Sequence, residues 1–119
     1  MTGGKRFRPQ YRLRQPAEFS IVLAGRQRLR GGWFDLSFRQ QEGASARLGL
    51  VIPKRLARRA VLRNRLKRLA REAFREVRGD LPVMDLVLRL ARSADGGADK
   101  EPSALWRRDI EMLLSRLPR

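Results

Sequence analysis

The sequence of 119 residues contains no cysteine and no histidine. The absence of cysteine excludes disulfide bonds, thiolate nucleophiles and cysteine-ligated zinc. The absence of histidine removes the usual general acid or base for RNA cleavage near neutral pH. No stretch reaches the roughly 18 apolar residues of a membrane span, and the N-terminus has no apolar signal core. We therefore expect a cytoplasmic protein that does not associate with membranes.

Acidic residues are also scarce: 12 of them stand against 28 lysines and arginines, which gives a formal net charge of +16. Such a charge attracts RNA, DNA or another polyanion almost regardless of the fold. Asp80 and Asp85 flank a turn, but without a third acid they form a weak metal site. The glycine-rich loop of phosphate-binding enzymes is missing as well. We therefore assign no catalytic residue, no metal ligand and no small-molecule substrate.

The length suits one RNA-binding domain with one core. Residues 1–14 are basic and have little to bury, which indicates a mobile arm ahead of a folded core at 15–119. Apolar periodicity predicts a helix at 17–24, strands at 33–38 and 47–52, a long helix at 57–77, a strand at 85–90 and a helix that Ser103 begins. A further short strand near 26–30 is left open. This order favours an α+β sandwich with helices over a small sheet.

The long helix has two contrasting faces. Its apolar face carries Leu62, Leu66, Leu69, Ala70, Ala73 and Val77, and its opposite face carries Asn64, Lys67, Arg68, Arg71, Arg75 and Arg78. Arginine donates two parallel hydrogen bonds that match a phosphate, and asparagine can read a base edge or a sugar. In the alternative interpretation Glu72 and Glu76 pair with these arginines and the face is only solvated, but two acids displaced from the face are too few. The expected partner is nucleic acid.

A second candidate surface involves cations after a strand and aromatic side chains. Lys54 and Arg55 follow the strand at 47–52, where the alternative is a plain polar corner. Phe19 and Trp33 can stack on unpaired bases, although filling the core is the more frequent use of aromatic residues in a small domain. If Phe34 belongs to the core, Trp33 points the other way and is the better stacking candidate.

Several segments resemble the protein subunit of bacterial ribonuclease P. In that family a glycine-bearing strand ends in two basic residues and precedes a helix with an Arg-Asn-Arg motif. The matching segments are RLGLVIPKR at 47–55, AVLRNRLKR at 60–68, REAFR at 71–75, Arg12-Leu13, Phe19 and DLVL at 85–88. The resemblance spans about residues 12–117.

The chain departs from the family pattern at a few of these positions. Pro53 replaces a small residue, Arg55 replaces a lysine, and Leu23 stands where many members have a second phenylalanine. Arg89 adds a charge to a strand that is usually apolar.

The resemblance implies an α-β-β-β-α-β-α sandwich of the ribosomal-protein-like two-layer type, with an unusual left-handed β-α-β crossover. It also implies an RNA catalyst, Mg²⁺ held mainly by that RNA, and two partners: ribonuclease P RNA and precursor tRNA, whose 5′ leader is removed. The residues implied to bind the catalytic RNA are Arg59, Arg63, Asn64, Arg65, Lys67, Arg68, Arg71 and Arg75. Those implied to bind the leader are Arg12, Phe19, Leu23, Trp33, Lys54 and Arg55.

Two other functions remain open from the residues alone. One is a structural RNA-binding protein of the ribosomal type, with no role in tRNA processing. The other is a DNA-binding protein that places the long helix in the major groove. A preference for duplex DNA would indicate the latter, whereas a preference for structured RNA with a single-stranded extension would indicate a ribonuclease P subunit.

Overall fold

A computed structural model describes residues 11–95 and 103–118 of the chain. Its elements in order are α1 (Pro16–Ala24), β1 (Arg28–Arg30), β2 (Phe34–Gln40), β3 (Arg47–Val51), α2 (Ala60–Val77), a short 3₁₀ turn η3 (Arg78–Asp80), β4 (Met84–Leu90) and α3 (Ser103–Ser115). The predicted α-β-β-β-α-β-α order is confirmed. The short strand left open near 26–30 is β1.

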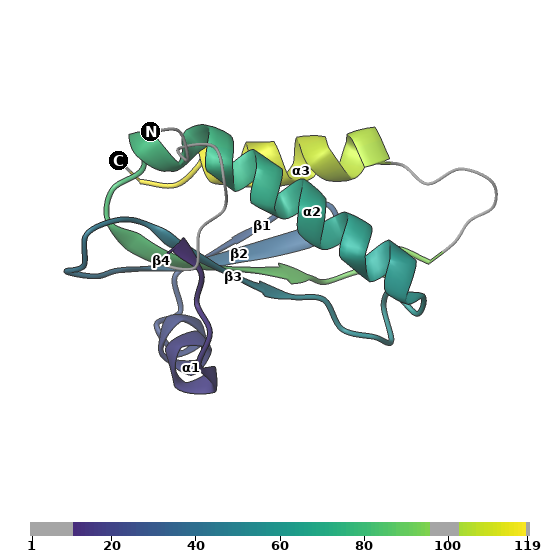
Figure 1. The fold of residues 1–119 in the computed structure, drawn as a ribbon, viewed down its shortest axis with the longest axis horizontal. Coiled ribbons are helices and arrows are strands. Elements are labelled where there is room, and N and C mark those ends of the chain that lie inside the picture. Colours follow the sequence, from purple (N-terminus) through teal and green to yellow (C-terminus); the bar gives the residue numbers. More distant parts are fainter. Residues whose placement is uncertain (1–10, 96–102, 119) are drawn as a thin grey trace.

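The four strands form one sheet in the order β1-β2-β4-β3. β2 pairs antiparallel with β1 and with β4, whereas β3 and β4 are parallel neighbours. Parallel neighbours require a crossover connection, and α2 supplies it. Figure 1 shows α2 and α3 together over one face of the sheet and α1 against the opposite face. The predicted sandwich therefore has a helix, α1, on its second face as well.

The alternation of side chains along the strands gives each face its own apolar cluster. The larger cluster lies under α2 and α3 and includes Phe34 and Leu36 of β2 together with Trp106 of α3. The smaller cluster consists of Leu13, Val22 and Val87, with Phe19 and Val51 packed against it. The larger cluster supplies most of the apolar burial, and the smaller one holds α1 on the sheet.

The fold begins earlier than the sequence indicates, so the predicted boundary of the mobile arm at residue 14 is wrong. Leu13 is only 5% exposed, and its amide donates to the carbonyl of Leu48 over 3.1 Å. Arg12 forms a parallel bridge with the same residue. The unpaired edge of β3 offers hydrogen-bond partners to any neighbouring extended segment, and Arg12 and Leu13 use them. The rest of the predicted arm, residues 1–10, lies outside the described residues.

The long helix begins at Ala60, three residues after the predicted start at 57. The preceding residues form turns instead, with the amides of Leu56 and Ala57 both donating to the carbonyl of Pro53. The amide of Arg58 donates to the Asp95 carboxylate at 2.9 Å. Local turn hydrogen bonds and the contact with Asp95 thus engage the backbone amides of residues 56–58, and the helix begins after them.

A buried carboxylate on α3 organises the entry into β2. Asp109 is 7% exposed and accepts hydrogen bonds from the amides of Gly32, Trp33 and Phe34 at 2.7, 2.9 and 3.0 Å. A buried charge is costly unless several donors satisfy it, and these three amides do so. This contact joins residues more than 70 positions apart, and no local sequence signal indicates it.

Candidate nucleic-acid interface

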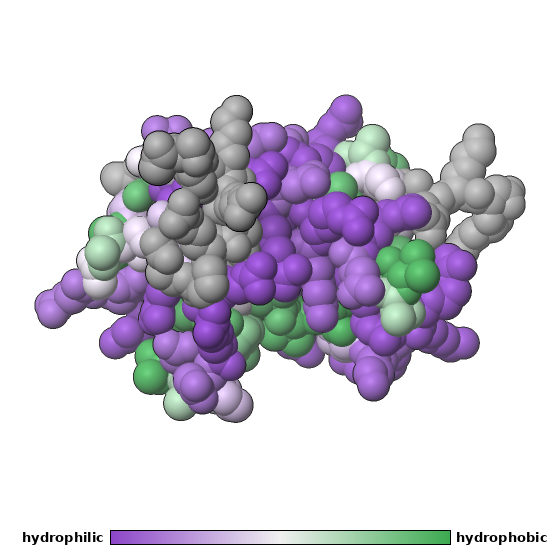
Figure 2. All heavy atoms as spheres, viewed as in Figure 1, coloured by the Kyte–Doolittle hydropathy of each residue, from purple (hydrophilic) through white to green (hydrophobic). Residues whose placement is uncertain are grey.

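The outward side of α2 carries Asn64, Lys67, Arg68, Arg71 and Arg75, hereafter the α2 surface. The opposite side packs into the larger apolar cluster through Leu62, Leu66, Ala70, Ala73 and Phe74. A hollow of about 380 Å³ runs along the α2 surface and is lined by Asn64, Arg68, Arg71, Glu72 and Arg75. The space-filling view shows hydrophilic side chains over α2 (Figure 2). The two predicted faces of this helix are therefore confirmed apart from Arg78, which lies beyond the helix in η3, and Phe74 joins the apolar face.

The two acids of α2 have a partner on another helix. Arg107 of α3 contacts Glu76 at 2.9 Å and Glu72 at 3.4 Å, and it also pairs with Glu111 on its own helix at 2.8 Å. Partial burial acts against the charge of Arg107, but hydrogen bonds to Glu76 and Glu111 outweigh it and raise its pKa. Since both acids turn to α3, the interpretation of α2 as a solvated, self-neutralised helix loses its basis.

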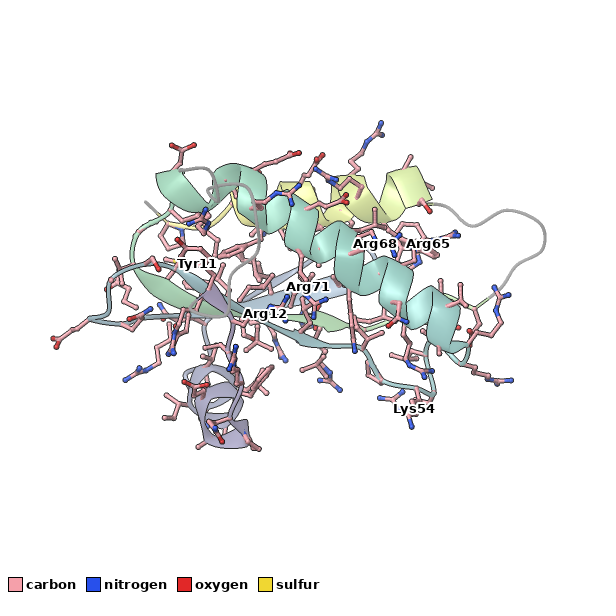
Figure 3. The ribbon with its side chains drawn as sticks, viewed as in Figure 1. Tyr11, Arg12, Lys54, Arg65, Arg68 and Arg71 are labelled. Carbon is pink, nitrogen blue, oxygen red and sulfur yellow. The ribbon has the colours of Figure 1, made fainter. Side chains whose placement is uncertain are left out.

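Two arginines from distant parts of the sequence meet beside α2. Figure 3 shows Arg12 next to Arg71, just below the helix. Partial burial lowers the pKa of the Arg71 guanidinium, and the like charge of Arg12 lowers it further. Arg12 was predicted to bind the leader together with Phe19, but the structure groups it with the α2 surface. The bridge of Arg12 to β3 explains this position, since it sends Arg12 and Leu13 to opposite faces of the sheet.

Other basic residues around α2 differ in what they do for the fold. Arg63 donates from one nitrogen to the carbonyls of Ala57 and Arg58, at 3.0 and 2.7 Å, and so holds the segment that leads into the helix. Arg59 is the residue before the helix and is exposed. Arg65 is half-buried and lies one turn before Arg68 (Figure 3).

The opposite face of the sheet presents the α1 surface, which consists of Phe19 and Leu23 of α1 with Gly49 and Val51 of β3. The Phe19 ring lies on Gly49 of β3 so closely that a Cβ atom at Gly49 would come within 2.5 Å of it. Phe19 is nevertheless only half-buried, and Leu23 is 44% exposed. Phe19 therefore belongs to the core on one side and faces solvent on the other.

A charged network ties α1 to the sheet. Arg47 of β3 donates two hydrogen bonds to Asp85 of β4, at 2.9 and 2.8 Å, and a third to Glu18 of α1 at 2.9 Å. Glu18 also accepts from the amides of Gln15 and Arg14; these two hydrogen bonds and that of Arg47 lower its pKa. Asp85, which the sequence analysis considered with Asp80 as a weak metal site, is thus a partner of Arg47. Among the described residues, no group of three or more histidine, cysteine, aspartate or glutamate side chains is arranged to hold a metal ion.

The remaining predicted leader-binding residues do not all lie together. Lys54 and Arg55 are exposed beyond the end of β3, and Figure 3 shows Lys54 on the same side of the sheet as α1. Trp33 is half-buried and packs against the larger cluster, to which Phe34 also belongs. The expectation that these two neighbours point to opposite faces is wrong, because Trp33 precedes β2 in the turn that Asp109 holds, where strand alternation does not apply.

The fold and its surfaces together define a small α+β protein whose long helix presents a cationic side suited to binding a polyanion. A family model described as ribonuclease P matches residues 7–118. The protein component of ribonuclease P from Azoarcus sp. is 42% identical over 114 residues, which cover 96% of this chain and 92% of the relative. That from Coxiella burnetii is 40% identical over 97 residues, with 82% and 79% covered. The chain belongs to the ribonuclease P protein family.

Solved structures agree with this assignment. The ribonuclease P protein from Thermotoga maritima superimposes with a TM-score of 0.76 at 28% identity, covering 91% of this chain and 98% of that one. The Staphylococcus aureus protein gives the same TM-score at 23% identity, over 88% and 93% of the two chains. The latter likeness concerns the fold alone. No helix in the described part of the chain is long and apolar enough to cross a membrane.

Proposed function

We propose that this chain is the protein component of ribonuclease P and assists the removal of the 5′ leader from precursor tRNA in the cytoplasm. Membership of the family supports its place in this endoribonuclease. The single structural observation that carries the proposal is the α2 surface, a row of cations whose nearby acids are engaged by Arg107. Such a row binds the phosphates of a structured RNA and releases the counterions condensed on it.

The proposed partner of the α2 surface is ribonuclease P RNA, which in this proposal also carries the catalytic site. The principal contacts would come from Asn64, Lys67, Arg68, Arg71 and Arg75, with Arg12 beside them. A phosphate held between Arg12 and Arg71 would relieve the repulsion between their charges. Arg63 would contribute chiefly by holding the start of α2 in place.

Mg²⁺ would be held mainly by the RNA. The ion prefers several oxygen ligands in an octahedral arrangement. Several carboxylates in the described part of the chain have other partners: Asp85 binds Arg47, Asp109 binds three amides, and Glu72 and Glu76 bind Arg107. These residues do not fit a magnesium site, so we derive no catalytic step from the protein.

The α1 surface is the proposed binding site for the single-stranded leader. Phe19 offers a half-buried aromatic ring to an unpaired base, and Leu23 lies one turn further along the helix. Lys54 lies on the same side of the sheet and adds positive charge beyond the end of β3, and the exposed Arg55 follows it in the chain. Arg12 and Trp33 lie with the other face or the other cluster, and they have no part in this proposal for the leader.

Reconstitution with a bacterial ribonuclease P RNA tests the function. Precursor tRNA is incubated with the RNA alone, the protein alone and both together, at a Mg²⁺ concentration that barely supports the RNA alone. We expect cleavage at the mature 5′ end only in the combined sample. Binding without any increase in cleavage would favour a structural RNA-binding protein, and cleavage by the purified, RNA-free protein would refute an RNA catalyst.

A further inference from the structure

The hollow on the α2 surface contains an acid among its cations. Glu72 lines it together with Asn64, Arg68, Arg71 and Arg75. Along the helix, Glu72 follows Arg68 by four positions and precedes Arg75 by three, so both guanidiniums are within reach of its carboxylate. A carboxylate in this position can pair with arginines that would otherwise bind phosphate, and it repels phosphate itself. The phosphate affinity of the α2 surface therefore depends on the direction in which Glu72 points.

Arg107 of α3 draws the Glu72 carboxylate towards α3. Its Nη1 contacts Glu72 at 3.4 Å, its Nη2 contacts Glu76 at 2.9 Å, and its Nε donates to Glu111 at 2.8 Å. One guanidinium thus uses three nitrogens for three carboxylates on two helices. Arg68 and Arg75 form no ion pair or side-chain hydrogen bond with any other described residue. Both arginines are therefore available to a ligand while Arg107 is in place.

The fold holds these acids by no other means than the guanidinium. The side chains of Glu72 and Glu76 are 39% and 62% exposed, so burial does not immobilise them. The two acids are also four positions apart on one helix, where like charges repel each other. Without a cation between them, this repulsion pushes Glu72 away from Glu76 and towards the hollow.

We propose that Arg107 is a positioning residue for RNA binding: it keeps the Glu72 carboxylate off the α2 surface and so leaves Arg68 and Arg75 available to phosphate. This inference rests on the proposed function, in which the ligand of that surface is ribonuclease P RNA. Arg107 itself need not touch the RNA. When it is removed, Glu72 pairs with Arg68 or Arg75, and each such pair replaces one phosphate contact.

Removal of Arg107 should leave the fold intact, because α2 and α3 are joined by apolar packing. Figure 1 shows the two helices over the same face of the sheet. Their shared cluster includes fully buried side chains of both helices, among them Leu66, Phe74, Trp106, Ile110 and Leu113. A partly exposed ion pair contributes little beside such a core.

The first test compares Arg107→Gln with Arg108→Gln in binding to ribonuclease P RNA. Arg108 is the next residue of α3, is exposed and has no ion pair or side-chain hydrogen bond in the described part of the chain, so both variants lose the same charge. We expect Arg107→Gln to weaken binding roughly three- to ten-fold and to lower the slope of log K against log salt by about one. Arg108→Gln should bind nearly as wild type. Equal binding by the two variants would exclude a positioning role.

The second test adds a second substitution to Arg107→Gln. Glu72→Gln should restore both the affinity and the salt slope, because no carboxylate then competes with phosphate in the hollow. Glu76→Gln restores the same net charge, but Glu76 does not line the hollow, so we expect much less recovery. Equal recovery with both substitutions would assign the effect to net charge, and no recovery with Glu72→Gln would mean that Arg107 does not act through Glu72.

Thermal melting separates positioning from a purely structural role. Glu72→Gln cannot rebuild the lost ion pair, so the double variant should bind RNA as wild type does while melting no higher than Arg107→Gln. Affinity that instead follows the melting temperature through all these variants would contradict the proposal. Failure of the proposed function gives a different result: wild-type protein would then neither bind ribonuclease P RNA nor stimulate precursor cleavage.

Discussion

The α2 surface and the α1 surface differ in how they are assembled. The α2 surface comes from one continuous helix, in which residues three or four positions apart lie side by side. The α1 surface combines a short helix with residues of β3, and its neighbours are set by strand register. The first is suited to many phosphates of a folded RNA, whereas the second combines an aromatic ring with a few placed charges. This difference predicts that the two surfaces can be disabled independently.

The largest effect is expected from removing charge on the α2 surface. Replacing Lys67, Arg68 and Arg75 together by alanine should reduce the affinity for ribonuclease P RNA by about 100-fold or more at physiological salt and lower the salt slope by about two to three. The ratio of precursor to mature tRNA affinity should not change. Filter binding over a salt series measures both quantities.

The control for this triple variant removes the same charge elsewhere. Arg39, Arg92 and Arg108 are exposed and lie outside the α2 surface, so their combined replacement should leave the salt slope nearly intact. Equal losses in both triple variants would mean that net charge, and not the α2 surface, determines binding.

Phe19→Ala should impair the α1 surface and leave the α2 surface intact. A base stacked on an aromatic ring contributes about 1–3 kcal/mol, so precursor affinity should fall roughly ten-fold or more while mature tRNA affinity barely changes. The variant should also melt earlier, because Phe19 packs against the smaller cluster. Affinities of both RNAs are therefore measured well below the melting temperature. If both fell alike, Phe19 would have only a packing role.

Gly49→Ala probes the packing of the Phe19 ring on β3. The new methyl group would meet the Phe19 ring and the Leu13 side chain, so we expect a loss of about 1–2 kcal/mol in stability and a few-fold loss of precursor affinity. Gly79→Ala is the matched control, because no atom lies within 4 Å of its Cβ position. Chemical denaturation and precursor binding, measured on both variants, test this; identical behaviour of the two would argue against the close contact at Gly49.

The smallest effect concerns the attachment of α1 through Glu18. Its pKa is lowered by amide hydrogen bonds and by Arg47, so it stabilises the folded state above its ordinary value of 4.5. That contribution is lost as the pH falls through the lowered pKa. Because the pair is partly exposed, we expect it to amount to less than about 1 kcal/mol. Melting temperatures measured at several pH values below 5 should therefore fall less steeply in Glu18→Gln than in wild type. Parallel curves for the two proteins would contradict this role.

The sequence predicts the α2 surface well because a helix has a fixed period. The apolar residues Leu62, Leu66 and Ala70 identify the buried side without knowledge of any partner. The opposite side follows from the same geometry. The sequence does not show which cations stabilise the fold itself. Arg63 donates to the segment before α2, and Arg107 of α3 pairs with Glu76 of α2.

The α1 surface could be predicted only in part. Phe19 and Lys54 were indicated by residue type and position as well as by the family resemblance, whereas Arg89 appeared only as an unusual charge in an apolar strand. Its alignment with Asp35 and Val51 depends on the register of two strand pairs. A shift of register by one residue would send these side chains to the other face, and no local pattern fixes that register across such distances.

By itself, the sequence determined the order of helices and strands, the cationic side of the long helix and the absence of cysteine and histidine chemistry. These properties depend on composition and on contacts between residues close in the chain. Only the tertiary structure decided that Arg12 lies beside Arg71, that Trp33 joins the larger cluster and that Asp109 holds the start of β2. The physical reason is that hydrogen bonds and packing between distant segments contribute as much free energy as local preferences, yet leave no periodic trace in the sequence.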